Sequence, residues 1–126
     1  FLCIALVGVR GILLQPGILA AVSPHHAVAF FSRHHVHGFL DDFPQAIAAA
    51  DLVISRSGGS VFELAAVGRP AILVPYPHAT ADHQTGNARW LSEAGAAIII
   101  RDDELNAERL RELVGALLSL NDRLSL

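Results

Sequence analysis

The order of the apolar runs after Gly38 constrains the fold of this chain more strongly than any other feature. Runs at 51–55, 71–74 and 96–100 alternate with segments whose apolar residues recur at helical spacing. Buried strands of parallel sheets form continuous apolar runs, and helices usually connect them. The pattern predicts an α/β fold, in which a Rossmann-like parallel sheet has flanking helices. The 126 residues, 52% of them hydrophobic, are enough for one core.

Start and stop signals bound the first two predicted helices. Asp41 or Asp42 can cap a short helix that has Pro44 in its first turn. A second helix begins near Ser60 and ends at Gly68, because glycine readily adopts the left-handed conformation that closes a helix.

Two further helices are predicted in the last third of the chain. The segment 82–93 has a helical pattern that Gly95 closes. Asn106 is the expected N-cap of the last helix, with Leu105 and Leu110 as its hydrophobic staple. The acidic residues at 102–104 are expected to face water and to favour the start of that helix.

Residues 1–35 show no persistent helical or alternating pattern. We therefore leave 1–35 as an unassigned, atypical segment and assign 36–126 to a single domain. Five histidines, His25, His26, His34, His35 and His37, raise the question of a metal site. Adjacent histidines on a strand point to opposite faces, so no metal is expected there. The absence of methionine predicts that the chain is a fragment.

Composition excludes several partners. The net charge is −3 and the basic residues are scattered singly, which excludes a nucleic-acid surface. A lone cysteine, Cys3, excludes an internal disulfide and predicts a reducing compartment, the cytoplasm. The apolar opening at 1–22 is interrupted by Arg10 and Pro16 before it reaches the ~20 residues that a membrane span needs, so no membrane span is predicted there.

The strongest local signal is the loop Arg56-Ser57-Gly58-Gly59 between a predicted strand and a predicted helix. Glycines allow a ligand to approach the backbone, and free N–H groups at a helix start favour a phosphate. Ser60 and Glu63 also match the S-x-x-E capping box, which needs no ligand. The spacing leaves both interpretations open.

Gln84 and Asn87 form the second candidate group. They lie three residues apart on a predicted helix that follows the loop 75–81, so they share a helix face. Ligands gather beyond the carboxyl ends of strands in open α/β sheets, where amides can bind sugar hydroxyls. Either amide can instead cap a loop or face solvent.

These residues are part of a wider resemblance. The runs at 50–64, 68–71, 75–78, 82–84 and 87–88 together resemble family 28 glycosyltransferases, over about 36–118. The resemblance is greatest to members that transfer N-acetylglucosamine from UDP-N-acetylglucosamine to a lipid-linked muramoyl-pentapeptide during peptidoglycan synthesis. It implies the C-terminal, donor-binding half of a GT-B glycosyltransferase that inverts the anomeric centre without a cofactor or a metal.

The resemblance also implies a role for each matching position. The expected binding residues are Phe39 and Leu40 for uracil, Ser57, Gly58, Gly59, Ser60 and Val61 for the diphosphate, Glu63 for the ribose, and His83, Gln84 and Asn87 for the donor sugar. The sequence departs from the family in three places. His83 stands where glutamine is frequent, the loop before Glu63 is one residue shorter than in some relatives, and residues 1–35 lack a Gly-Gly-Ser-x-Gly loop.

The catalytic base is expected on an N-terminal acceptor domain, in cis or in trans. That domain would bring the lipid-linked acceptor, and the intact enzyme is expected at the inner face of the plasma membrane. Two alternatives remain open. The chain can be a separate donor subunit of another N-acetylglucosamine transferase, or a non-catalytic nucleotide-sugar-binding module or gene remnant.

Overall fold

A computed structural model describes residues 4–8, 11–14, 34–36 and 41–124. Its centre is a six-stranded sheet with the strand order β3-β2-β1-β4-β5-β6. The strands are β1 (Ile4–Gly8), β2 (Gly11–Leu14), β3 (His34–Val36), β4 (Leu52–Ser55), β5 (Ala71–Leu73) and β6 (Ala97–Ile99). The three strands expected from the apolar runs are confirmed as β4, β5 and β6.

The sheet is parallel in one half and mixed in the other. β4, β5 and β6 are parallel neighbours, which confirms the α/β prediction. β1 runs antiparallel to both β2 and β4, so the sheet is not parallel throughout. β1 and β2 also show that the unassigned segment 1–35 contributes strands. Their runs are short and show neither a helical nor an alternating pattern, which is why periodicity did not find them.

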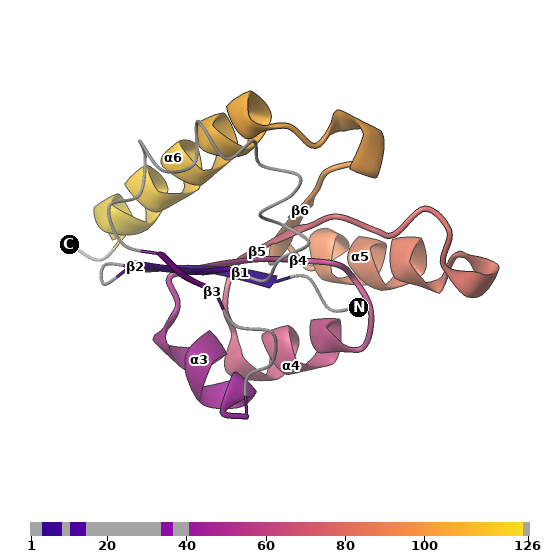
Figure 1. Cartoon of the computed structure of the whole chain (residues 1–126), viewed down its shortest axis with the longest axis horizontal. Coiled ribbons are helices and arrows are strands. Elements are labelled where there is room, and N and C mark those ends of the chain that lie inside the picture. Colours follow the sequence, from indigo (N-terminus) through magenta and orange to yellow (C-terminus); the bar gives the residue numbers. More distant parts are fainter. Residues whose placement is uncertain (1–3, 9–10, 15–33, 37–40, 125–126) are drawn as a thin grey trace.

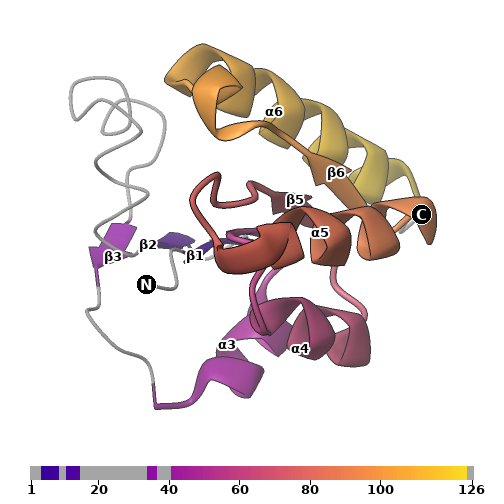
Figure 2. The same ribbon diagram turned by 90° about the vertical axis from the view of Figure 1, so that its right-hand side faces the viewer.

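Helices cover both faces of this sheet (Figures 1 and 2). The α-helices are α3 (Phe43–Ala49), α4 (Ser60–Val67), α5 (His83–Glu93) and α6 (Ala107–Leu124). Two 3₁₀ turns, η1 (Thr80–Asp82) and η2 (Asp102–Glu104), precede α5 and α6. α6 lies on one side of the sheet, and α3 and α4 lie on the other.

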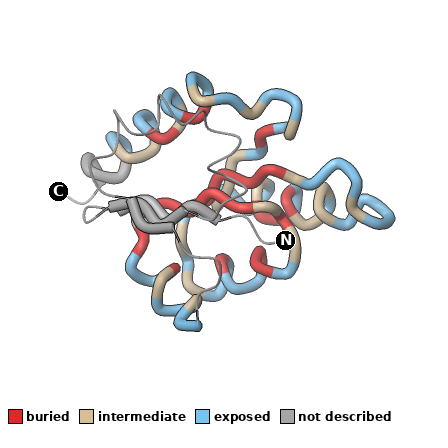
Figure 3. The backbone as a smooth tube through the Cα atoms, in the orientation of Figure 1, coloured by how far each residue is buried: buried red, intermediate tan, exposed pale blue. Residues whose placement is uncertain are grey.

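Buried segments lie in the central strands and on the helices on both sides of the sheet (Figure 3). The residues of β4 and β5 alternate between two hydrophobic clusters. Leu52, Ile54 and Ile72 belong to the cluster that contains Leu110 and Val114 of α6. Intervening strand residues belong to the cluster beneath α3, α4 and α5, which comprises Ile47, Ala50, Val53, Val61, Leu64, Ala71, Leu73, Ala88 and Leu91. Burial on both faces explains why β4 and β5 read as continuous apolar runs.

The predicted helix ends are largely confirmed. Gly68 closes α4 at φ 74°, a left-handed conformation that favours glycine. Asn106 Oδ1 accepts the Arg109 N–H at 2.8 Å and caps α6, while Leu105 packs against the cluster that contains Leu110. Asp42 stands at the N-cap of α3, but its side chain makes no capping hydrogen bond.

Strand direction defines the edge of the sheet that can hold a ligand. The carboxyl ends of β4, β5 and β6 meet at one edge, and the loops that follow them lie together there. One row of paired residues crosses the sheet from β4 to β3 and contains Ile54, Ala5, Leu14 and Val36. β3 therefore ends at this same edge, about 14 Å from β4 by three strand spacings.

Candidate functional site

Three buried serines support the turn that follows β4. Ser55, Ser57 and Ser60 are 1%, 0% and 6% exposed. The hydroxyl of Ser55 donates to the Arg56 carbonyl at 2.6 Å and lies 3.3 Å from the Ser60 hydroxyl. Ser57 Oγ donates to the Gln84 carbonyl at 2.6 Å. The serine side chains therefore support the turn from its buried side.

The capping box proposed from the sequence does not form. Gly59 is the N-cap of α4, which places Ser60 inside the helix. The Ser60 hydroxyl instead lies 3.3 Å from the Ser55 hydroxyl, at the end of β4, and donates to the Arg56 carbonyl of the turn at 3.4 Å. Glu63 is exposed, and no described residue forms a hydrogen bond with its carboxylate. Its carboxylate is thus available to a ligand.

Gly58 and Gly59 leave open space at the start of α4. Val61 and Phe62 donate to the Gly58 and Gly59 carbonyls, both at 3.2 Å. No described carbonyl accepts the N–H groups of Gly59 and Ser60. A Cβ on Gly59 would meet nothing within 4 Å, and Gly59 has an ordinary helical φ of −58°. Glycine is therefore not required here by the unliganded backbone.

The two amides of α5 are tied to neighbouring loops. Gln84 Oε1 accepts the Tyr76 N–H at 2.9 Å, and Asn87 Nδ2 donates to the Ser57 carbonyl at 3.1 Å. These bonds leave Gln84 Nε2 and Asn87 Oδ1 unbonded among the described residues. Gln84 Nε2 is also close to the turn, 3.8 Å from a Cβ built on Gly58. The structure thus brings Ser57, Gly58, Gln84 and Asn87 together.

The connection into α5 is strained. Ala81 and Asp82 have φ values of 53° and 54°, in the left-handed region that side chains disfavour. Asp82 was expected inside the helix, and it instead ends the 3₁₀ turn that precedes His83. Thr85 Oγ1 donates to the Asp82 carboxylate at 2.6 Å, which helps to hold the kink. His83 follows as an exposed side chain at the first position of α5.

Arg56 and Asp102 form an ion pair that the sequence reasoning missed. Asp102 was expected to face water with its acidic neighbours, and this interpretation is wrong for Asp102. The guanidinium of Arg56 also lies 5.5 Å from the centre of the Tyr76 ring. An arginine directly after an apolar strand, beside a glycine loop, is a signal that could have predicted an ion pair for Arg56, but it does not say with which acidic residue.

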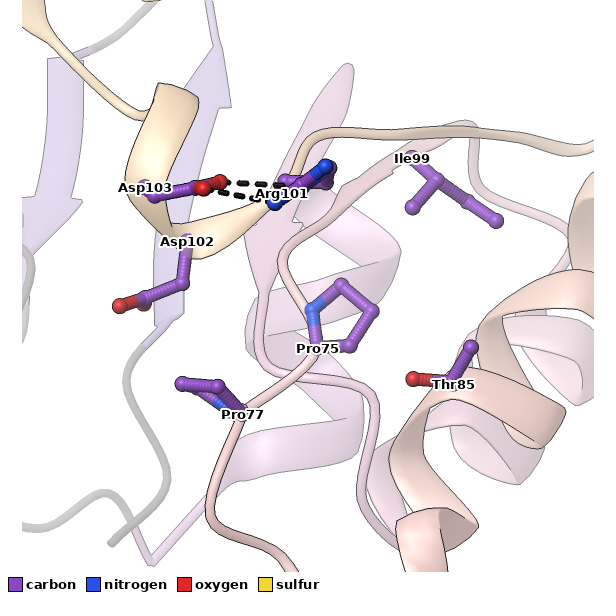
Figure 4. A pocket seen from close by; sticks show the side chains of 7 residues that line it. All are labelled: Pro75, Pro77, Thr85, Ile99, Arg101, Asp102 and Asp103. Atoms are coloured by element: carbon purple, nitrogen blue, oxygen red, sulfur yellow. Dashed lines mark hydrogen bonds and ion pairs between the residues drawn. The ribbon is translucent and has the colours of Figure 1, made fainter.

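A cavity of about 310 Å³ has Asp102, the partner of Arg56, as one of its lining residues (Figure 4). It is lined by Pro75, Pro77, Thr85, Ile99, Arg101, Asp102 and Asp103. Figure 4 shows the Asp103 carboxylate paired with Arg101, whereas Asp102 is turned away from that pair. The cavity therefore lies between the loops that follow β5 and β6, next to the turn after β4.

Some expected features fall outside the described residues. Phe39 and Leu40 do so, as do Cys3 and the histidines His25, His26 and His37. Within the described part of the chain, no three potential ligands gather where they could hold a metal ion. Nor does any helix of that part combine the length and apolar character needed to cross a membrane.

Comparison with known proteins identifies the family. The model of the glycosyltransferase family 28 C-terminal domain matches residues 12–125. The chain belongs to glycosyltransferase family 28. The match includes the turn after β4 and the start of α5, and it extends further toward the N-terminus than the resemblance of 36–118 seen in the sequence.

Individual relatives of this family 28 chain share one name. A protein of Solibacter usitatus is 56% identical over 77 residues, 60% of this chain and 21% of the relative. A protein of Syntrophotalea carbinolica is 43% identical over 107 residues, 84% of this chain and 30% of the relative. Both are named UDP-N-acetylglucosamine--N-acetylmuramyl-(pentapeptide) pyrophosphoryl-undecaprenol N-acetylglucosamine transferase.

A solved structure agrees with these relatives. The crystal structure of Acinetobacter baumannii MurG superposes with a TM-score of 0.62 at 40% identity, covering 68% of this chain and 25% of that one. The family 28 chain therefore spans between 20% and 30% of the length of these relatives.

Proposed function

We propose that this chain binds UDP-N-acetylglucosamine as the donor domain of an inverting N-acetylglucosamine transferase in peptidoglycan synthesis. One observation carries the proposal. The N–H groups of Gly59 and Ser60 are unpaired among the described residues, and they lie at the start of α4 on the carboxyl edge of three parallel strands. The names of the relatives support the choice of donor and of pathway.

The turn is suited to a diphosphate. Free N–H groups and the helix dipole concentrate about half a positive charge at a helix start, which attracts phosphate oxygens. Gly58 and Gly59 carry no side chain that would keep those oxygens at a distance. In sugar transfer the UDP leaves with additional negative charge, so the free N–H groups of Gly59 and Ser60, together with the dipole of α4, stabilise the departing diphosphate.

The ribose is assigned to Glu63. This exposed residue lies in the first turn of α4, near the diphosphate turn. An ionised carboxylate only accepts hydrogen bonds, and it has two oxygens for the two ribose hydroxyls. Phe39 and Leu40, which lie outside the described residues, are assigned to uracil on the resemblance to family 28 alone.

The donor sugar is assigned to the start of α5. Gln84 Nε2 remains a donor and Asn87 Oδ1 remains an acceptor after both amides have bonded to the loops. A sugar hydroxyl both donates and accepts, so it can bind between them. The exposed His83 is the third residue assigned to the sugar.

The base belongs to an acceptor domain, in cis or in trans, that would carry the lipid-linked acceptor at the inner face of the plasma membrane. There it would deprotonate the acceptor hydroxyl, which attacks the anomeric carbon as UDP leaves from the opposite side. Such an attack inverts the anomeric centre. This chain contributes donor binding and leaving-group stabilisation.

Calorimetry with four ligands tests the proposal. The chain should bind UDP-N-acetylglucosamine and UDP, and it should bind ADP and GDP more weakly because the uracil contacts are lost. Equal affinity for UDP, ADP and GDP would refute the nucleotide assignment. Binding of UDP with no added affinity from the sugar would refute the roles of Gln84 and Asn87.

A further inference from the structure

We propose that Asp102 is a positioning residue for the diphosphate turn, acting through Arg56. The inference rests on the proposed function. Asp102 lies in η2, after the last strand of the sheet, and no role in donor binding follows from the resemblance at this position. Its carboxylate nevertheless pairs with the first residue of the turn.

Arg56 links the ends of three strands. It directly follows β4, and its Nη1 lies 3.4 Å from the carbonyl oxygen of Val74, the residue after β5. The same nitrogen pairs with Asp102, which follows β6. The Tyr76 ring packs near the guanidinium at 5.5 Å. A displacement of Arg56 would therefore disturb the loops that follow β4, β5 and β6.

The backbone of the turn depends on this anchor. The Arg56 carbonyl accepts the Ser55 hydroxyl at 2.6 Å and lies 3.4 Å from the Ser60 hydroxyl. Gly58 and Gly59 have no side chains with which to fix their own conformation. Arg56 thus holds the start of the turn, and the next residue, Ser57, holds it to α5 through its hydrogen bond to the Gln84 carbonyl.

The position of the guanidinium favours support from behind the turn over direct contact with phosphate. The Arg56 and Asp102 side chains are only 22% and 37% exposed, and Nη1 is already shared between Asp102 and a carbonyl. The neighbouring pair of Arg101 and Asp103 is 70% and 66% exposed. A more shielded pair is screened less by solvent, so its loss has more effect.

A matched pair of variants tests the proposal. Asp102→Asn removes the charge and keeps the shape, whereas Asp103→Asn does the same to the exposed pair next to it. Asp102→Asn should weaken UDP binding about fivefold and leave uridine binding unchanged, because uridine lacks the diphosphate. Asp103→Asn should change neither affinity. Asp102→Glu, which retains a carboxylate, should recover most of the lost UDP affinity.

A second measurement needs no ligand. In NMR spectra of the free chain, the amide resonances of Gly58 and Gly59 should shift in Asp102→Asn and stay in place in Asp103→Asn. Unshifted resonances in Asp102→Asn would overturn the positioning role, as would equal losses of UDP and uridine affinity. Failure of the unaltered chain to bind UDP would instead refute the proposed function, and the glycine shifts would still test the role of Asp102.

Discussion

Replacing Glu63 by glutamine separates a ligand-binding carboxylate from a helix-stabilising one. The change keeps the size of the side chain and removes its charge. Because Gly59 is the N-cap of α4 and the capping box is absent, the only stabilising effect left to this exposed carboxylate is its interaction with the helix dipole. That effect is about 0.3–1 kcal/mol. Glu63→Gln should therefore lower the free energy of unfolding by less than about 1 kcal/mol.

The expected loss of ligand affinity is larger. A hydrogen bond to a charged group contributes about 1.5–3 kcal/mol, so loss of the charged acceptor should raise the dissociation constant for UDP roughly 10- to 150-fold. Isothermal titration calorimetry measures this change, and urea denaturation measures the stability. Binding of 2′-deoxy-UDP should be affected less than binding of UDP, since one of the two ribose hydroxyls is already missing.

Glu108→Gln is the matched control. Glu108 is also an exposed glutamate in the first turn of a helix, α6, and it lies outside the turn after β4. Its replacement should cost similar stability and leave UDP affinity unchanged. The ribose assignment would be refuted by a Glu63→Gln chain that loses more than about 1 kcal/mol of stability and binds UDP with unaltered affinity.

Three further substitutions probe the same site. Gly59→Ala should leave the melting temperature nearly unchanged, since a Cβ there meets nothing within 4 Å, and calorimetry should show weaker UDP binding because the methyl group would obstruct the phosphate. Gln84→Ala should destabilise the chain by about 0.5–1.5 kcal/mol in urea denaturation, because the Tyr76 N–H loses its acceptor. In calorimetry, Gln84→Ala and Asn87→Ala should each reduce the affinity for UDP-N-acetylglucosamine more than the affinity for UDP. Ala81→Gly should stabilise the chain by about 1 kcal/mol, because glycine adopts a φ of 53° without strain; a lower unfolding midpoint would contradict this.

The sequence predicted the second half of the fold well. Each apolar run from residue 51 onward is a strand, and the ends at Gly68 and Asn106 lie where their local chemistry placed them. Such features are predictable because a short segment carries the whole signal. Burial on both faces of the sheet makes β4 and β5 uniformly apolar, and a left-handed glycine closes a helix without help from distant residues.

Features that depend on contacts between distant residues were not predictable. The pairing of Arg56 with Asp102 joins positions 46 residues apart, and nothing in either segment specifies the partner. The antiparallel pairing of β1 with β4 is likewise not specified by the sequence of either strand, because a strand can pair with several neighbours in a sheet. Within the candidate site, spacing correctly grouped Gln84 with Asn87, but it did not show that each amide is partly occupied by a backbone group.

The place of β6 at the end of the sheet affects how the isolated chain behaves at high concentration. An unpaired strand edge is a template for association with another sheet, especially when it is long, flat and apolar. β6 has only three residues, and the charged residues Arg101, Asp102 and Asp103 follow it closely. Both features limit edge-to-edge aggregation, although Ile99 is exposed on this strand. Replacing the charged residues after β6 by apolar β-branched ones would lengthen the edge and lower the solubility of the chain.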